Sequence, residues 1–126
     1  METSTVQIVV RHLSGARATE IDVVPVGAHR ELILGRARSA AIRFDVRRDD
    51  AVGRQHARIE QVAGTGGFRL VDLDSRNGTF LNGERLTAPA PLGSGDLVRL
   101  GADGPEIEIQ IEPRAMTLAP EPGRTR

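Results

Sequence analysis

The stretch DLDSRNGTFLNG, residues 72–83, contains two Asn-Gly pairs that bracket the apolar triplet TFL. Asn and Gly both tolerate a positive φ, so each pair indicates a tight turn. An Asn side chain held beside such a turn offers one acceptor and two donors, a set that suits an extended peptide backbone. The stretch therefore predicts a turn-rich protein and marks Asn77 as a candidate peptide-binding residue.

Short strand signals recur on both sides of this stretch. The last of them, EIEIQIE, alternates strictly, so Ile107, Ile109 and Ile111 share one face. Pro25 indicates an edge strand or a strand end, and the glycine-rich segment 63–67 predicts a β-hairpin. Strands are expected over residues 5–13, 20–26, 30–36, 41–46, 56–62, 68–74, 84–86, 97–101 and 106–112.

The chain shows no sustained period of 3.6 residues, and about ten short strands at this spacing favour an all-β sandwich. Its 126 residues fit one domain. We place that domain at residues 1–112. Residues 113–126 carry three Pro, no periodicity and little to bury, so they are expected to form a disordered tail or linker.

The formal net charge is zero, which gives no global field toward nucleic acid or a membrane but permits a local basic patch. All 17 basic residues are Arg. Codon bias explains this more readily than selection does, yet Arg still suits bidentate contact with carboxylate or phosphate. Without a membrane-length apolar run or an N-terminal leader pattern, we expect a cytoplasmic location, either alone or as the cytosolic domain of a larger protein.

Catalytic and metal motifs are missing from the sequence. With no Cys there is no disulfide or thiolate zinc site, and His12, His29 and His56 lack metal-type spacing. No nucleophile motif is present, so we predict neither an enzyme nor a cofactor, a small β-fold hydrolase being the enzymatic alternative. The segment 64–67 lacks the lysine and helix of a phosphate loop. In RRDDAVGR (47–54) two Asp offset two Arg, and no aromatic platform lies nearby to bind nucleic acid.

Four blocks in order, LGR (34–36), GRQHA (53–57), DLDSRNGT (72–79) and FLNG (80–83), resemble the forkhead-associated (FHA) domain. The family pattern is Gly-Arg, Ser-x-x-His, Asn-Gly-Thr and Asn-Gly, and the resemblance covers roughly residues 6–112. It implies an eleven-strand β-sandwich whose loops at one end bind phosphothreonine peptides. It further implies a monomeric module that acts in signalling or as the regulatory part of a larger protein.

The resemblance also implies a role for each matching residue. The phosphate would be bound by Arg36, Gly53, Arg54 and Arg76, and the peptide backbone by Asn77. Loop architecture would depend on Gly35, His56, Gly78, Asn82 and Gly83. A phosphate carries a charge of about −1.5 to −2 and three acceptor oxygens, so it rewards Arg side chains gathered from separate loops.

Gly53 departs from the family pattern, which has Ser at this position. A hydroxyl donating to a phosphate oxygen contributes about 1.5–3 kcal/mol, so its loss corresponds to roughly ten- to a hundredfold in affinity. The alternative function is therefore an FHA fold with a weakened phosphate site that mediates phosphorylation-independent protein–protein interaction.

The loop ahead of Gly53 sets specificity in the family for the third residue after the phosphothreonine. Here it contains Asp49, Asp50 and Ala51. Two carboxylates predict tolerance of basic or apolar residues at that peptide position. A further hypothesis is that the chain's own Thr3, Thr5 or Thr117, once phosphorylated, binds to its own pocket or to a neighbour's.

Overall fold

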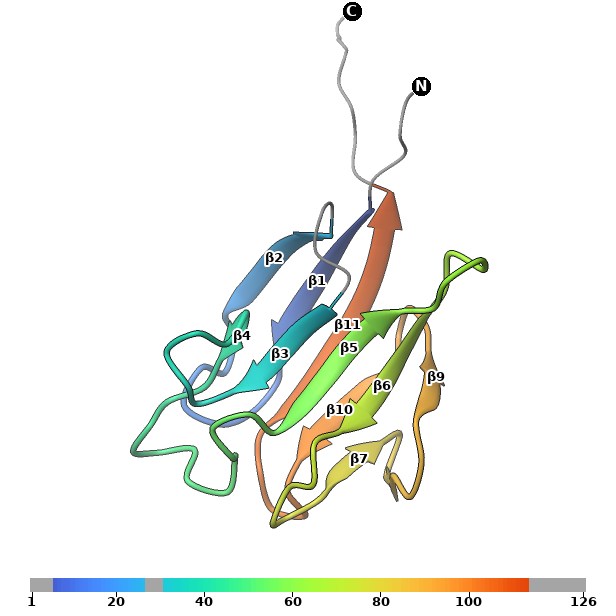
Figure 1. Ribbon diagram of the computed structural model, residues 1–126. Coiled ribbons are helices and arrows are strands. Elements are labelled where there is room, and N and C mark those ends of the chain that lie inside the picture. The colour runs from blue at the N-terminus through green and yellow to red at the C-terminus, as the bar shows by residue number, and fades with distance from the viewer. Residues whose placement is uncertain (1–5, 27–30, 114–126) are drawn as a thin grey trace, which may run out of the picture.

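The computed structural model describes residues 6–26 and 31–113, which form two packed β-sheets (Figure 1). The six-stranded sheet has the order β2-β1-β11-β10-β7-β8 and the five-stranded sheet the order β4-β3-β5-β6-β9. The strands are β1 (Val6–His12), β2 (Ile21–Val26), β3 (Glu31–Gly35), β4 (Ile42–Arg43), β5 (Ala57–Gln61), β6 (Phe68–Asp72), β7 (Thr79–Leu81), β8 (Glu84–Arg85), β9 (Ala90–Leu92), β10 (Leu97–Leu100) and β11 (Glu106–Pro113). The eleven-strand all-β sandwich is thereby confirmed.

The core lies between the sheets and follows the alternation in the sequence. Ile107 and Ile109 are fully buried and Ile111 packs beside them, so the predicted face of β11 is confirmed. Facing them from the five-stranded sheet are Leu34, Ile59 and Leu70, all buried. Aliphatic side chains supply nearly all of this core, with Phe44 and Phe68 as its buried aromatic members.

Two local predictions are confirmed, and three strands differ. β5 and β6 form the expected hairpin, and β2, which contains Pro25, is an edge strand. β4 covers only Ile42–Arg43 because Asp45 turns the chain, its carboxylate accepting the N–H groups of Arg47 and Arg48 at 2.8 Å. β7 and β9 are not predicted by periodicity, since three residues each carry too little pattern and β9 includes Pro91.

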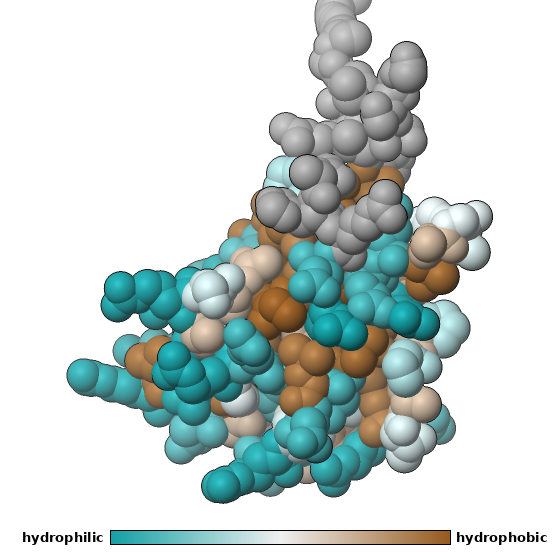
Figure 2. All heavy atoms as spheres, in the orientation of Figure 1, coloured by the Kyte–Doolittle hydropathy of each residue, from teal (hydrophilic) through white to brown (hydrophobic). Residues whose placement is uncertain are grey.

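Six connections gather at one end of the sandwich, the lower end in Figure 1. They are residues 13–20, 36–41, 44–56, 73–78, 86–89 and 101–105. Figure 2 shows largely hydrophilic side chains at this end of the visible face. Val6 and Pro113 pair at the opposite end. No helix in the described ranges is long and apolar enough to cross a membrane. The tail 114–126, His29 and the candidate threonines Thr3, Thr5 and Thr117 lie outside the described residues.

Candidate functional site

The end of β3 is joined backbone to backbone with the loop that precedes β5. Arg36 N–H donates to the Gly53 carbonyl (3.0 Å) and Ala37 N–H to the Arg54 carbonyl (2.9 Å). A Cβ added to Gly35 would lie 2.1 Å from the Arg54 oxygen, so only glycine permits this approach. The pairing fixes where the side chains of Arg36 and Arg54 begin.

His56 is fully buried and links the same loop to the Asn-Gly turn. Its Nδ1 accepts the Gly53 N–H (2.9 Å), and its Nε2 lies 2.8 Å from the Gly78 carbonyl. Since a backbone N–H can only donate, the ring proton is on Nε2 and the imidazole is neutral. Burial lowers the pKa of His56 below its ordinary value, although the bond to Gly78 acts to raise it.

The turn carrying Asn77 is organised from inside by Asp72, the last residue of β6. Its carboxylate accepts from the Ser75 backbone N–H (3.1 Å), the Ser75 hydroxyl (2.5 Å) and the Thr79 hydroxyl (2.6 Å). Ser75 Oγ in turn accepts the Gly78 N–H at 3.0 Å. Burial acts to raise the pKa of Asp72, but the hydrogen bonds from Ser75 and Thr79 outweigh it and the pKa lies below its ordinary value.

Arg36 is half-buried and binds the long loop rather than extending freely into solvent. Its Nε donates to the Val52 carbonyl (2.5 Å) and its Nη1 to the Val46 carbonyl (2.8 Å). Nη2 makes no hydrogen bond to the described residues, and it is the part of this guanidinium left to meet a ligand. Arg36 therefore supports the loop as well as lying at its mouth.

Arg54, Arg76 and Asn77 are exposed at this end of the sandwich. Neither arginine side chain makes a hydrogen bond or ion pair with any residue in 6–26 or 31–113. Asn77 Nδ2 donates to the Ala51 carbonyl (2.9 Å), which joins the two loops across the site. Gly101 completes the junction, because a Cβ there would lie 3.1 Å from Ala51 Cβ and 3.4 Å from Asn77 Cβ.

Gly53 has space for a side chain. A Cβ at this position would meet nothing closer than 3.8 Å, the nearest atoms being His56 Cα and Nδ1. Its backbone does not occupy the left-handed region. The glycine is therefore not a steric requirement of this loop, in contrast to Gly35.

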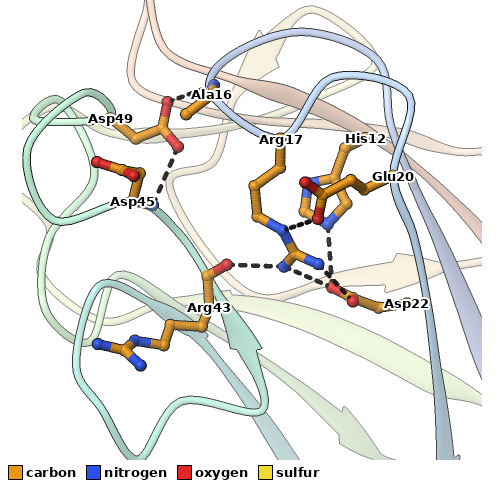
Figure 3. A network of polar contacts seen from close by, with 8 residues as sticks. All are labelled: His12, Ala16, Arg17, Glu20, Asp22, Arg43, Asp45 and Asp49. Carbon is orange, nitrogen blue, oxygen red and sulfur yellow. Dashed lines mark hydrogen bonds and ion pairs between the residues drawn. The ribbon is translucent and has the colours of Figure 1, made fainter.

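Asp49 requires a correction, since it was expected to face the peptide. Its side chain is buried, and its carboxylate accepts the N–H groups of Ala16 (3.1 Å) and Asp45 (3.2 Å), as Figure 3 shows. A carboxylate turned inward in this way holds the loop together and cannot select peptide residues. Asp50 and Ala51 remain accessible on the loop surface.

A neighbouring polar network fixes the 13–20 connection beside this loop (Figure 3). Arg17 binds Asp22 with both terminal nitrogens (2.8 and 2.6 Å) and also donates to the Arg43 carbonyl (2.8 Å). The buried His12 contacts the same Asp22 carboxylate at 3.0 Å. The network connects β1 and β2 to β4, and thus one sheet to the other at the loop end.

Asn82 and Gly83 form the turn between β7 and β8, both with positive φ (51° and 89°). The Asn82 amide accepts the Leu97 N–H (3.0 Å) and donates to Asp96 (3.2 Å). This places Asn82 against the start of β10, at the far end of β7 from the Asn77 turn. Its contacts therefore support the sheet, and they do not reach the ligand loops.

Sequence reasoning missed the internal supports Asp72, Ser75 and Thr79. All three stand inside the quoted block DLDSRNGT, and the Asp-x-x-Ser spacing is the signal that points to a capped turn. Across the described ranges, no three His, Cys, Asp or Glu side chains are grouped as metal ligands. The loop end thus offers arginines, an asparagine and backbone groups, which are the donors that an anionic peptide requires.

Comparison with known proteins identifies the family. The FHA-domain model matches residues 32–101, which is more than half of the 126-residue chain. The chain therefore belongs to the FHA-domain family. No curated protein sequence matches it.

Solved structures agree with this assignment. The chain is 26% identical to an FHA domain from a structural and functional analysis of phosphothreonine-dependent FHA domain interactions, over 86% of this chain and 99% of that one (TM-score 0.66). It is 25% identical to the FhaA FHA domain complexed with the intracellular domain of Rv3910, over 82% and 99% (TM-score 0.63). The FHA domain of an Arabidopsis thaliana hypothetical protein matches over 93% and 97% with 24% identity (TM-score 0.76), which supports the fold.

Proposed function

We propose that this domain binds phosphothreonine-containing segments of partner proteins through its loop end, without catalysing a reaction. One observation carries the proposal: Arg36, Arg54 and Arg76 come from three loops that are locked together by Gly35, His56 and Asn77. None of the three has an acidic partner among the described residues, because the side chain of Arg36 donates only to the backbone carbonyls of Val52 and Val46. The net charge of the chain is zero, yet these arginines form a local cationic surface at one end. Such a surface supports the binding of an anion.

Gly53 offers no hydroxyl to a phosphate, and its own backbone groups are already engaged. The Gly53 N–H already donates to His56, and its carbonyl accepts from Arg36. Arg54 and Arg76 then carry most of the phosphate contact, with Nη2 of Arg36. This arrangement supports binding weaker than a serine at position 53 would give.

The third residue after the phosphothreonine would meet an acidic recess of about 240 Å³ next to Ala51. Asp50 and Asp103 are the exposed carboxylates on its lining, and Arg48 also lies there. Asp49 also lines the recess, but its carboxylate already accepts hydrogen bonds from the backbone N–H groups of Ala16 and Asp45. We propose that this recess accepts basic or apolar peptide residues.

A second candidate function is phosphorylation-independent protein binding. Gly53 favours this second function, because the family pattern has a phosphate-binding serine at this position. The exposed Arg54 and Arg76 favour phosphothreonine binding, since a domain that binds without phosphate does not require unpaired cations on these loops. A signalling or regulatory role in the cytoplasm follows from phosphothreonine reading rather than from any separate observation.

Binding of the chain's own threonines is limited by distance. Thr117 lies four residues beyond Pro113, which is a reach of at most about 14 Å. β11 alone separates Pro113 from the loop end by about 23 Å. Thr3 and Thr5 stand even closer to Val6, which pairs with Pro113. A phosphorylated Thr3, Thr5 or Thr117 would therefore bind to a second copy and not to its own pocket.

The test is a titration of a phosphothreonine peptide library and of its unphosphorylated copy. Arg76→Ala and Arg54→Ala are the informative variants, because both side chains are exposed and hold nothing in place. Each is expected to weaken phosphopeptide binding about ten- to a hundredfold while leaving the free domain equally stable. Arg36→Ala will also loosen the loop, as Arg36 binds Val46 and Val52. Equal binding of both peptide copies would support the phosphorylation-independent function instead.

A further inference from the structure

Arg85, on the edge strand β8, lies directly against the Asn77-Gly78 turn. A Cβ placed on Gly78 would be 2.8 Å from Arg85 Nε, 3.0 Å from Cζ and 3.2 Å from Nη2. The guanidinium therefore lies over the backbone of Gly78, the residue that follows the candidate peptide-binding Asn77. β8 brings it there by pairing with β7, where Arg85 stands opposite Phe80.

The charge of Arg85 is not used within the described part of the chain. Its side chain is exposed and has no carboxylate within ion-pair distance there. Three other strand arginines, Arg11, Arg69 and Arg99, each pair with a Glu on a neighbouring strand, whereas Arg43 on β4 has no ion pair to the described residues. Arg85 shares its unpaired state with Arg54 and Arg76, the exposed cations of the candidate site.

The turn thus has oppositely charged surroundings on its two sides. On one side Asn77 bonds Ala51, beside the recess that contains Asp50 and Asp103. On the other side Gly78 is covered by Arg85. A peptide held at Asn77 with its phosphate on Arg54 and Arg76 passes between a negative and a positive flank.

We propose that Arg85 is a specificity residue that selects an Asp or Glu next to the phosphothreonine, on the side of the peptide away from the acidic recess. The proposal rests on the phosphothreonine-binding function. It adds a fourth cation that reads the sequence around the phosphate rather than the phosphate itself. The preferred partner segment is then asymmetric, acidic on one side of the phosphothreonine and basic or apolar on the other.

A purely structural role for Arg85 predicts something different. Gly78 has a φ of 87°, so the turn already requires glycine whether or not a guanidinium covers it. If Arg85 only packed there, a neutral side chain of similar length would serve equally well. Charge, and not length, is therefore what the test has to vary.

The experiment uses phosphothreonine peptides with Ala or Gly flanks into which one Asp is moved position by position, titrated by calorimetry. Wild-type protein should gain about two- to fivefold in affinity for Asp at one flanking position, the magnitude of an exposed ion pair. Arg85→Gln should lose this gain and keep the affinity for the Asp-free phosphopeptide within twofold. Arg85→Glu should prefer Arg at that position.

Arg69→Gln is the matched control, because it makes the same change of charge on β6 away from the loop end and should retain the gain. The proposal is overturned if no position favours Asp, or if Arg85→Gln keeps the gain. It is equally overturned if Arg85→Gln weakens binding of the Asp-free phosphopeptide as much as binding of the Asp-containing phosphopeptides. Arg85 would then belong to the phosphate contact. The unphosphorylated copies of the peptides test the proposed function itself. If the protein binds them as tightly as the phosphorylated ones, both the proposed function and the role of Arg85 are refuted. If it prefers the phosphorylated ones but no position favours Asp, only the role of Arg85 is refuted.

Discussion

The α-carbon of Gly35 lies so close to the carbonyl of Arg54 that a Cβ at position 35 would be 2.1 Å from that oxygen. Both groups belong to the backbone, so no rotamer change relieves the clash. Gly35→Ala should therefore separate β3 from the phosphate loop, lower the free energy of unfolding by about 1–3 kcal/mol and impair peptide binding. Chemical denaturation and peptide titration measure the two effects.

Gly53→Ala is the control for this change. Its Cβ meets nothing closer than 3.8 Å, and its φ lies outside the left-handed region. Its stability should stay within about 1 kcal/mol of wild type, or rise slightly through the unfolded state. Equal losses in the two alanine variants would contradict the packing argument.

Gly53→Ser should tighten binding of phosphothreonine peptides. The structure leaves room for the side chain, and a hydroxyl at this position can donate to a phosphate oxygen. The expected gain is about ten- to a hundredfold, with no gain for the unphosphorylated copy. Isothermal titration of wild type, Gly53→Ser and Gly53→Ala separates the hydroxyl from the methyl group. If serine and alanine behave alike, the glycine is not a missing contact.

His56 makes the free domain sensitive to acid. Burial holds its pKa below the ordinary value of about 6.5, so the unfolded chain binds a proton more readily than the folded one. The contribution of His56 to stability is therefore complete above about pH 6.5 and is lost as the pH falls toward the folded-state pKa. Protonated Nδ1 would also oppose the Gly53 N–H. NMR titration of the His56 ring without ligand should show a midpoint below 6.5.

Ligand has to be absent from that titration because the phosphate itself takes up a proton near pH 6. A His56 midpoint at or above 6.5 would mean that the imidazole is not held as a neutral acceptor.

Asp72 contributes to stability in the same direction at lower pH. Its pKa lies below the ordinary value, so its contribution to stability is present above about pH 4 and declines as the pH falls further.

Asp49 and Asp50 are neighbours with different roles. Asp49→Ala removes a buried carboxylate that accepts two backbone N–H groups, so it should cost about 1–3 kcal/mol of stability. Asp50→Ala changes an exposed side chain and should alter stability by less than about 0.5 kcal/mol, while reducing the preference for basic peptide residues. Thermal denaturation and a peptide array read the two outcomes. A stability loss at Asp50 as large as that at Asp49 would contradict the assignment.

Periodicity and turn chemistry sufficed for the architecture, because alternating strands such as β11 and tight turns such as Asn82-Gly83 are encoded locally. β9 escaped detection because a three-residue strand at a sheet edge has no pattern of its own. Side-chain direction was the harder problem. Asp49 and Asp50 are chemically identical in the sequence, and only the three-dimensional course of residues 13–20 decides which carboxylate turns inward. Arg85 was missed for the same reason, since its approach to Gly78 depends on strand pairing.

The Gly78 carbonyl accepts two hydrogen bonds at once, from His56 Nε2 and from the Gly101 N–H, each 2.8 Å long. His56 precedes β5 and Gly101 follows β10, so this one oxygen atom connects the two sheets beside the Asn77 turn. Any opening fluctuation that parts the sheets here must also release the turn that carries Asn77. Hydrogen exchange of the Gly53 and Gly101 amides should therefore slow together when ligand binds, because separation of the sheets and opening of the site are the same motion.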